Sequence, residues 1–308
     1  MEVSSKELQE RLKWSLEQKI DHSLYVIENF LALYPNSKVA FSGGIDSTVM
    51  LYLVRFIDKD RVGVFANTTN EFSEILQFVR TIDNIDVVKP AMSFFDTVER
   101  YGFPLVSKKV ARMIHDVRNP TERNVASRNL YLTGVKRDGS KTLSYKISER
   151  WKPLIDVKFD LTSKCCDILK KKPMNKVMGS DGVFIGTMAS DSELRQISYL
   201  RTGCINTTSN QCNPLSIWTK EDVWEFVRRY NIPYCDVYDK GEKQTGCAYC
   251  GFGCHLESGS RFDRLRIREP KRYGQMMKLE NNGVTYKEAI NKILSIAGRE
   301  RLDEWLLF

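Results

Sequence analysis

The feature that most constrains this chain is a short apolar strand that turns through two glycines into a helix, over residues 38–51. Val39 to Phe41 predicts a buried strand, and a helical pattern begins after Ser42-Gly43-Gly44-Ile45-Asp46-Ser47. In such a turn the free N–H groups of the first helical residues point to one place, together with the positive end of the helix dipole. Phosphate is the usual ligand of this arrangement. The loop therefore predicts an α/β fold with an anion site at the carboxyl end of a strand.

Asp46 is unexpected in a loop built only for anions, because its carboxylate repels them. A carboxylate at this position fits a cation such as Mg²⁺, which accompanies nucleotide phosphates and prefers oxygen ligands. The alternative is a glycine turn whose serine and aspartate side chains only cap the helix.

The six residues from Ser42 to Ser47 resemble the PP-loop, SGGxDS, of the ATP-pyrophosphatase superfamily. They do not form a Walker A loop, because no Gly-Lys-Ser/Thr follows. Enzymes of that superfamily cleave ATP between the α and β phosphates. The residues of this loop that the resemblance assigns to the nucleotide are Phe41, Ser42, Gly43, Gly44, Asp46 and Ser47.

Apolar strands alternate with helical patterns after this loop, with strands expected at residues 61–67 and 85–89. This alternation is typical of a parallel sheet covered on both faces, whose ligands bind beyond the carboxyl ends of the strands. Asn67 and Thr68 end the second strand and are expected beside the nucleotide. Related enzymes often have Asp/Asn-Thr-Gly here, whereas this chain has Thr69 in place of the glycine.

The predicted fold is an α/β domain with a parallel, Rossmann-like sheet of the adenine nucleotide alpha hydrolase type, followed by a helical extension that contains cysteines. The sequence suggests three consecutive parts, namely a helical segment over 1–37, a nucleotide-binding domain over 38–235 and a C-terminal region over 236–308.

A further strand at residues 182–188 leads into a helix start, where Ser190 and Glu193 have the spacing of a capping box. The segment resembles the Gly-x-Arg-x-x-x-Ser-x-x-Arg stretch of the phosphoadenosine phosphosulfate (PAPS) reductase branch, although Met188 stands where that branch often has arginine. The resemblance implies nucleotide contacts by Thr187, Met188 and Arg195, with Arg195 stabilising charge on the phosphates. The alternative role of Arg195 is a structural ion pair.

Two cysteine pairs, Cys165-Cys166 and Cys247-x-x-Cys250, form the second chemical signature. A Cys-x-x-Cys among glycines is typical of a metal or cluster knuckle. Together the pairs resemble the [4Fe–4S] site of adenylylsulfate reductases, which implies that Cys165, Cys166, Cys247 and Cys250 ligate a cluster. Zinc held by four cysteines is the alternative, and Cys254 could replace one ligand.

The charge of the chain is unevenly distributed. The net charge is +8, and residues 107–172 contain 17 Lys/Arg against 7 Asp/Glu. This composition suits a polyanion such as nucleic acid or a highly charged nucleotide, or else a solvated helix face. Lys108, Lys109 and Arg112 lie on a predicted basic helix and are candidates for substrate binding. No apolar run has membrane-spanning length and no signal peptide is evident, so a cytoplasmic protein without membrane contacts is expected.

These features predict an enzyme that cleaves ATP with Mg²⁺ to AMP and pyrophosphate and so activates an acceptor for sulfur transfer. Asp46 and Arg195 are its expected catalytic residues, and a nucleic-acid acceptor and a sulfur-donor protein are its expected partners. No cysteine follows Cys254, whereas PAPS and adenylylsulfate reductases carry a nucleophilic cysteine in a C-terminal Glu-Cys-Gly-Leu-His segment. The alternatives are a sulfonucleotide reductase that forms sulfite and a non-catalytic, nucleic-acid-binding iron–sulfur protein.

Overall fold

The computed structural model describes residues 3–257 and 260–302. The chain divides into two compact units, and each unit is built from two separate stretches of sequence. Unit 1 comprises residues 1–90 and 171–246, and unit 2 comprises residues 91–170 and 247–308. This division into two units of two stretches each differs from the three consecutive parts suggested by the sequence.

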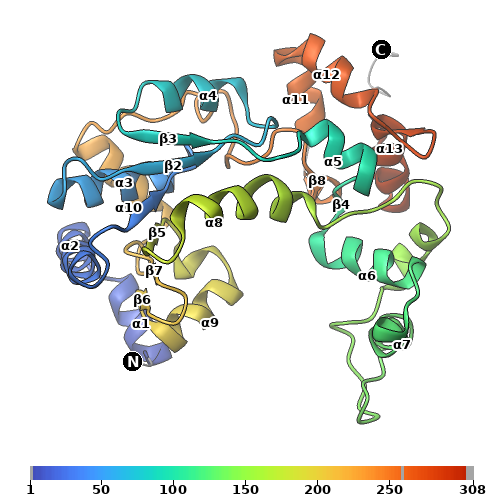
Figure 1. Cartoon of the computed structure of the whole chain (residues 1–308), viewed down its shortest axis with the longest axis horizontal. Helices are drawn as coiled ribbons and strands as arrows, with labels where there is room; N and C mark the ends of the chain where they lie inside the picture. Colours follow the sequence, from blue (N-terminus) through green and yellow to red (C-terminus); the bar gives the residue numbers. More distant parts are fainter. Residues whose placement is uncertain (1–2, 258–259, 303–308) are drawn as a thin grey trace. The chain divides into compact units, whose positions relative to one another are not determined.

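Unit 1 is organised around a six-stranded sheet with the order β3-β2-β1-β5-β7-β6 (Figure 1). All neighbouring strands are parallel except β6 and β7, which are antiparallel. This sheet confirms the predicted α/β class. Its strands are β1 (Lys38–Ala40), β2 (Gly63–Ala66), β3 (Ile85–Val88), β5 (Val183–Ile185), β6 (Ile205–Asn206) and β7 (Gln211–Cys212).

Helices complete unit 1, with α2 and α10 packed against α3 and with α8 packed against β2 and β3. The predicted helical segment before the sheet contains two helices, because Ser15 starts a new helix through a capping box with Gln18. The helices of unit 1 are α1 (Ser5–Leu12), α2 (Leu16–Leu33), α3 (Ile45–Ile57), α4 (Ser73–Arg80), α8 (Lys172–Met178), α9 (Glu193–Thr202) and α10 (Lys220–Arg229).

The core of unit 1 contains large side chains from both of its stretches, among them Phe30, Phe184 and Trp218. The Trp218 indole N–H donates to the Ser23 hydroxyl at 2.9 Å, and that hydroxyl donates to the Pro214 carbonyl at 2.8 Å. The polar atom of a completely buried ring is thereby satisfied, as burial of an indole requires.

Unit 2 is mainly helical and contains two short sheets of two strands each. Its core is formed by Phe103, Tyr249, Phe262 and Tyr286. Its elements are α5 (Phe94–Tyr101), β4 (Leu105–Val106), α6 (Lys108–Arg118), α7 (Val125–Thr133), β8 (Gly251–Phe252), α11 (Arg261–Arg268), α12 (Pro270–Met277), β9 (Glu280–Asn281), β10 (Val284–Thr285) and α13 (Tyr286–Ile296).

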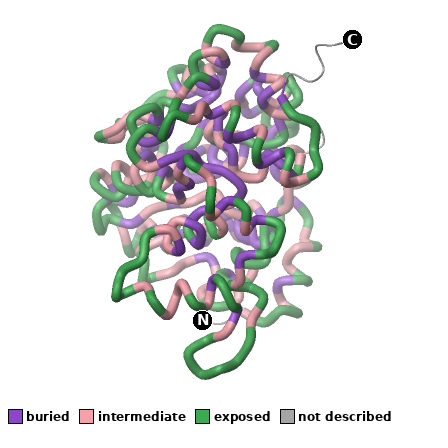
Figure 2. The backbone as a smooth tube through the Cα atoms, turned by 90° about the vertical axis from the view of Figure 1, so that its right-hand side faces the viewer, coloured by how far each residue is buried: buried purple, intermediate pink, exposed green. Residues whose placement is uncertain are grey.

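Buried positions are concentrated in the packed strands and helices, while many of the connecting loops are exposed (Figure 2). Within the described ranges, no helix combines the length and the apolar character that a membrane span requires.

Candidate functional site

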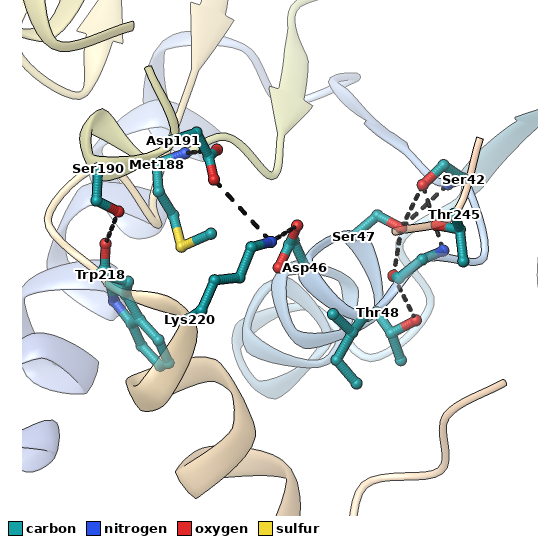
Figure 3. Close-up of polar contacts among 12 residues, drawn as sticks. Ser42, Asp46, Ser47, Thr48, Met188, Ser190, Asp191, Trp218, Lys220 and Thr245 are labelled. Carbon is teal, nitrogen blue, oxygen red and sulfur yellow. Dashed lines mark hydrogen bonds and ion pairs between the residues drawn. The ribbon is translucent and has the colours of Figure 1, made fainter. Parts of the chain in front are cut away.

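The loop between β1 and α3 is fixed by its own hydroxyl groups (Figure 3). The Ser47 hydroxyl accepts from the Ser42 N–H at 3.1 Å and donates to the Gly44 carbonyl at 2.8 Å. Gly43 has φ +71°, and a Cβ there would lie only 3.0 Å from Ile75 and 3.2 Å from Val79. Glycine is required at this position both by its backbone conformation and by the close packing of α4.

The first N–H group of α3 is engaged by a residue from a distant part of unit 1. The Ile45 N–H donates to the Tyr238 hydroxyl at 2.8 Å, and that hydroxyl lies 3.4 Å from the Thr245 hydroxyl. Burial raises the pKa of Tyr238, so its phenol remains protonated at neutral pH. Sequence reasoning did not identify Tyr238 or Thr245, because neither has a local signal that links it to the loop.

Asp46 projects from the first turn of α3 into a network of alternating charges. The Lys220 ammonium lies 2.5 Å from Asp46 Oδ2 and 4.0 Å from Asp191 Oδ1, as Figure 3 shows. Asp191 also forms an ion pair with Arg195. Burial raises the pKa of Asp46, although the hydrogen bond from Lys220 acts in the opposite direction. Asp46 Oδ1 is buried and has no hydrogen-bond partner among the described residues, so one carboxylate oxygen is available to a ligand.

Lys220 is the main residue of this site that the sequence did not reveal. It is the first residue of α10, directly after the N-cap Thr219, and 43% of its side chain is exposed. The Thr219–Asp222 capping box fixes where α10 begins. Where Lys220 then points depends on the packing of α10 against α3, which sequence spacing does not reveal.

The segment after β5 differs from the prediction in one detail. Ser190 does not cap the helix, because its hydroxyl donates to the Trp218 carbonyl at 3.0 Å; the N-cap of α9 is Ser192. Met188 is completely buried and its N–H donates to Asp191, while the Thr187 hydroxyl donates to Asn213 at 2.9 Å.

The residues after β2 are held in a strained turn. Thr69 has φ +66°, a left-handed conformation that is unusual for a β-branched residue and that glycine adopts without strain. This conformation explains why related enzymes have glycine at this position. The side-chain oxygen of Asn67 accepts from the Thr69 N–H at 3.0 Å. Thr68, between them, is fully buried. The turn lies at the carboxyl end of β2, which pairs with β1.

The four cysteines predicted as ligands all belong to unit 2. Strand β8 pairs in parallel with β4 and directly follows the Cys247–Cys250 turn, which a Cys250 N–H to Cys247 carbonyl bond of 3.2 Å closes. Cys165 and Cys166 begin a helical turn that continues as a π-helix over Asp167–Lys171. π-Helical turns occur frequently at functional sites.

The cysteines of the two pairs interact with one another. A hydrogen bond between the Cys165 and Cys166 thiols lowers the pKa of Cys166 to about 5 and raises that of Cys165, whose pKa is raised further by Cys250 and Cys247. Lys108 also hydrogen-bonds to Cys166 and lowers its pKa. A thiolate with a nearby ammonium is the form of cysteine that binds metals.

The three residues of α6 that the sequence proposes for substrate binding have contacts within unit 2. Lys108 contacts Cys166, the Lys109 ammonium lies 4.8 Å from the centre of the Tyr145 ring, and Arg112 pairs with Asp116 at 3.8 Å.

The remaining cysteines are buried thiols. Burial raises the pKa of Cys204 and Cys235 to about 11 and that of Cys254 to about 12, and it raises the pKa of Cys212 as well. All four are therefore protonated at neutral pH. Across residues 3–257 and 260–302, no group of three or more Cys, His, Asp or Glu side chains is arranged to hold a single metal ion.

The fold defines a class of α/β protein in which a glycine loop connects a strand of a mainly parallel sheet to the following helix. The sequence profile described as "Phosphoadenosine phosphosulfate reductase domain" matches residues 36–145 and 140–252. The chain therefore belongs to the phosphoadenosine phosphosulfate reductase family, as the resemblance in its loops predicted.

Relatives of this chain include several proteins named adenosine 5'-phosphosulfate reductase. The one from Lysinibacillus sphaericus is 32% identical over 89 residues, which is 29% of this chain and only 38% of that relative. The one from Halalkalibacterium halodurans is 22% identical over 251 residues, which is 77% of this chain and 82% of the relative. Among solved structures, the phosphoadenylyl-sulfate (PAPS) reductase from Candida auris in a phosphate complex is 14% identical. That comparison covers 80% of this chain and 97% of the other, with a TM-score of 0.43.

Proposed function

We propose that this chain is an enzyme that binds an adenine nucleotide at the Ser42–Ser47 loop and releases AMP from it in a reaction of sulfur metabolism. The observation that carries the proposal is the start of α3, where the glycine loop is followed by Asp46; Lys220 pairs with Asp46 and lies 4.0 Å from Asp191, the partner of Arg195. Backbone N–H groups and cationic side chains in this arrangement stabilise charge that develops on phosphate oxygens.

Reduction of adenylylsulfate to sulfite and AMP is the better supported of two possible reactions, because the relatives carry the name of that activity. In this reaction a thiolate attacks the sulfur of adenylylsulfate, the bond from sulfur to the phosphate oxygen breaks, and AMP leaves with the electron pair. A second thiol then displaces sulfite and forms a disulfide. Four other thiols of the chain are buried and have raised pKa values, namely those of Cys204, Cys212, Cys235 and Cys254. We therefore expect an external dithiol reductant to supply both the attacking thiolate and the second thiol.

Cleavage of ATP to AMP and pyrophosphate is the second candidate, and Asp46 favours it. A buried carboxylate oxygen without a partner fits Mg²⁺, which prefers oxygen ligands and would neutralise charge on the phosphates when bound. In this reaction an acceptor attacks the α-phosphorus and pyrophosphate leaves, so that the adenylated acceptor can receive sulfur. The loop N–H groups and Lys220 would hold the phosphates in line for this attack.

We further propose that Cys165, Cys166, Cys247 and Cys250 hold a [4Fe–4S] cluster. The donor set fits, because four thiols interact within one unit and Lys108 lies beside them to offset thiolate charge. Zinc held by the same four cysteines is the alternative, and the iron and zinc contents of the purified protein distinguish the two.

One experiment tests the proposed function. The protein, purified without oxygen, is incubated either with adenylylsulfate and dithiothreitol or with ATP and Mg²⁺, and AMP, sulfite and pyrophosphate are measured. We expect AMP together with sulfite in the first mixture. AMP with pyrophosphate in the second mixture alone would establish the ATP reaction instead. The absence of AMP from both mixtures would refute the proposal.

Two variants show whether AMP is formed at the loop. Gly43→Ala should abolish AMP release in either mixture, because alanine is strained at φ +71° and collides with α4. Asp86→Ala, an exposed change on β3, should have no effect and serves as the control.

A further inference from the structure

We propose that a surface of unit 2 binds single-stranded nucleic acid. The surface is formed by the hairpin that follows α7 and by the adjacent side of α6, and we call it the basic hairpin surface. The inference does not depend on which nucleotide reaction the enzyme performs. The residues that define the surface are Lys109, Lys136, Arg137, Lys141, Leu143 and Tyr145.

The hairpin has a defined backbone that presents its cations. Helix α7 ends at Gly134 in a left-handed conformation, and the Gly134 carbonyl accepts from the Thr142 N–H at 2.8 Å. The Lys136 N–H donates to the Ser140 carbonyl at 2.8 Å across the tip. In Figure 1 this loop extends beyond α7, and its residues 136–141 are all exposed.

The cations of the hairpin are not neutralised by ion pairs. Within the described part of the chain, no carboxylate lies within ion-pair distance of Lys136, Arg137 or Lys141. The acid at the tip, Asp138, accepts hydrogen bonds from the Ser140 N–H at 2.9 Å and hydroxyl at 2.7 Å. Three exposed cations on one short loop therefore form a positive patch, which is the electrostatic footprint expected for phosphates.

An exposed aromatic ring follows these cations in the chain and contacts Lys109 of α6. The Tyr145 side chain is 52% exposed, and the Lys109 ammonium lies 4.8 Å from its ring centre, which links the hairpin to α6. Leu143, two residues earlier, is 86% exposed. Unpaired bases stack on aromatic side chains beside positively charged grooves, whereas the bases of a duplex are already stacked. The exposed ring therefore favours a single strand over a duplex.

Binding to labelled oligonucleotides tests the inference. Fluorescence anisotropy of a 5'-labelled single strand and of the corresponding duplex is measured with the whole chain at increasing salt. The variant K136E/R137E/K141E should bind the single strand at least tenfold more weakly, and the slope of log K against log[salt] should fall by about 2 for three lost phosphate contacts. Tyr145→Ala should weaken single-strand binding about five- to tenfold and leave the salt slope unchanged.

A matched control distinguishes binding at this surface from a general effect of net charge. The variant K271E/K278E/K292E makes the same change in charge at three exposed lysines of unit 2 outside the hairpin, and it should bind like the unaltered chain. Equal weakening by the two triple variants would overturn the proposal, as would preferential binding of the duplex or no binding at low salt. The readout is binding alone, so failure here leaves the nucleotide reaction untouched, and unchanged circular dichroism excludes misfolding of the variants.

Discussion

Replacing Lys220 with alanine tests whether this residue binds the nucleotide or only forms an ion pair with Asp46. The Lys220 ammonium lies 2.5 Å from Asp46, and the two side chains are 43% and 26% exposed. Partly exposed pairs of this kind contribute about 0.5–1 kcal/mol to stability. The variant should therefore lower the melting temperature by only about 2 °C.

The effect on the nucleotide should be much larger than the effect on stability. A charge-assisted hydrogen bond to phosphate is worth about 1.5–3 kcal/mol, which corresponds to a loss of about ten- to a hundredfold in affinity. Without Lys220 the carboxyl of Asp46 remains buried but loses its hydrogen-bonded cation, so its pKa, already raised by burial, should rise further. Any step that needs ionised Asp46 then requires a higher pH.

Isothermal titration calorimetry with adenylylsulfate and with ATP plus Mg²⁺ measures the affinity, and a pH profile of AMP release reports on Asp46. The matched control is Arg229→Ala, at the other end of α10, where a side chain that is 45% exposed pairs with Glu17. The control should lose similar stability and keep its affinity. Our reasoning would be refuted if Lys220→Ala bound both nucleotides as tightly as the control with an unshifted pH profile.

Three further predictions concern the cysteines, the core and a helix cap. The proposed [4Fe–4S] cluster should give the protein a brown colour and bound iron, and Cys247→Ser should lose both. Cys212→Ser, a buried change in β7, should retain both. A colourless parent protein with one zinc would contradict the cluster. Ser23→Ala should lower the free energy of unfolding in urea by about 1–3 kcal/mol, because the buried Trp218 indole loses its acceptor. Hydrogen bonds from Thr285 at the α13 cap hold the pKa of Glu288 below its ordinary value of 4.5. The ionised Glu288 carboxylate therefore stabilises the fold fully above pH 4.5, and this stabilisation is lost as the pH falls through the lowered pKa. In Glu288→Gln the melting temperature should fall less in acid than in the parent, and an identical acid dependence would count against this cap.

The elements around the loop could be predicted because their signals are local. The apolar run of β1, the two glycines and the helical spacing of α3 lie within residues 38–57, so periodicity and turn chemistry suffice to place them. The Thr219 cap of α10 is equally local. The conformation of Thr69 also has a local reason, since the Asn67 side chain accepts from the Thr69 N–H and φ is +66°.

The partners of the loop could not be predicted, because they depend on how distant elements pack. Lys220 is 174 positions from Asp46, and Tyr238 is 193 positions from Ile45. Lys108 lies beside Cys166, which is 58 positions further along the chain. A sequence pattern gives the face of a helix on which a side chain lies, but the element opposite that face is set by the topology.

The assembly of each unit from two separate stretches affects the order in which the protein can form during synthesis. Strand β1 ends at Ala40, and its neighbour β5 begins at Val183, so at about 5–20 residues per second the ribosome needs about 7–30 s to supply that neighbour. During this interval β1 has β2 on one side and an open edge on the other. Cys165 and Cys166 likewise wait for Cys247 and Cys250, so the full set of four thiols exists only when most of the chain has been translated. The cluster proposed for these thiols would consequently be loaded late in the biogenesis of the protein.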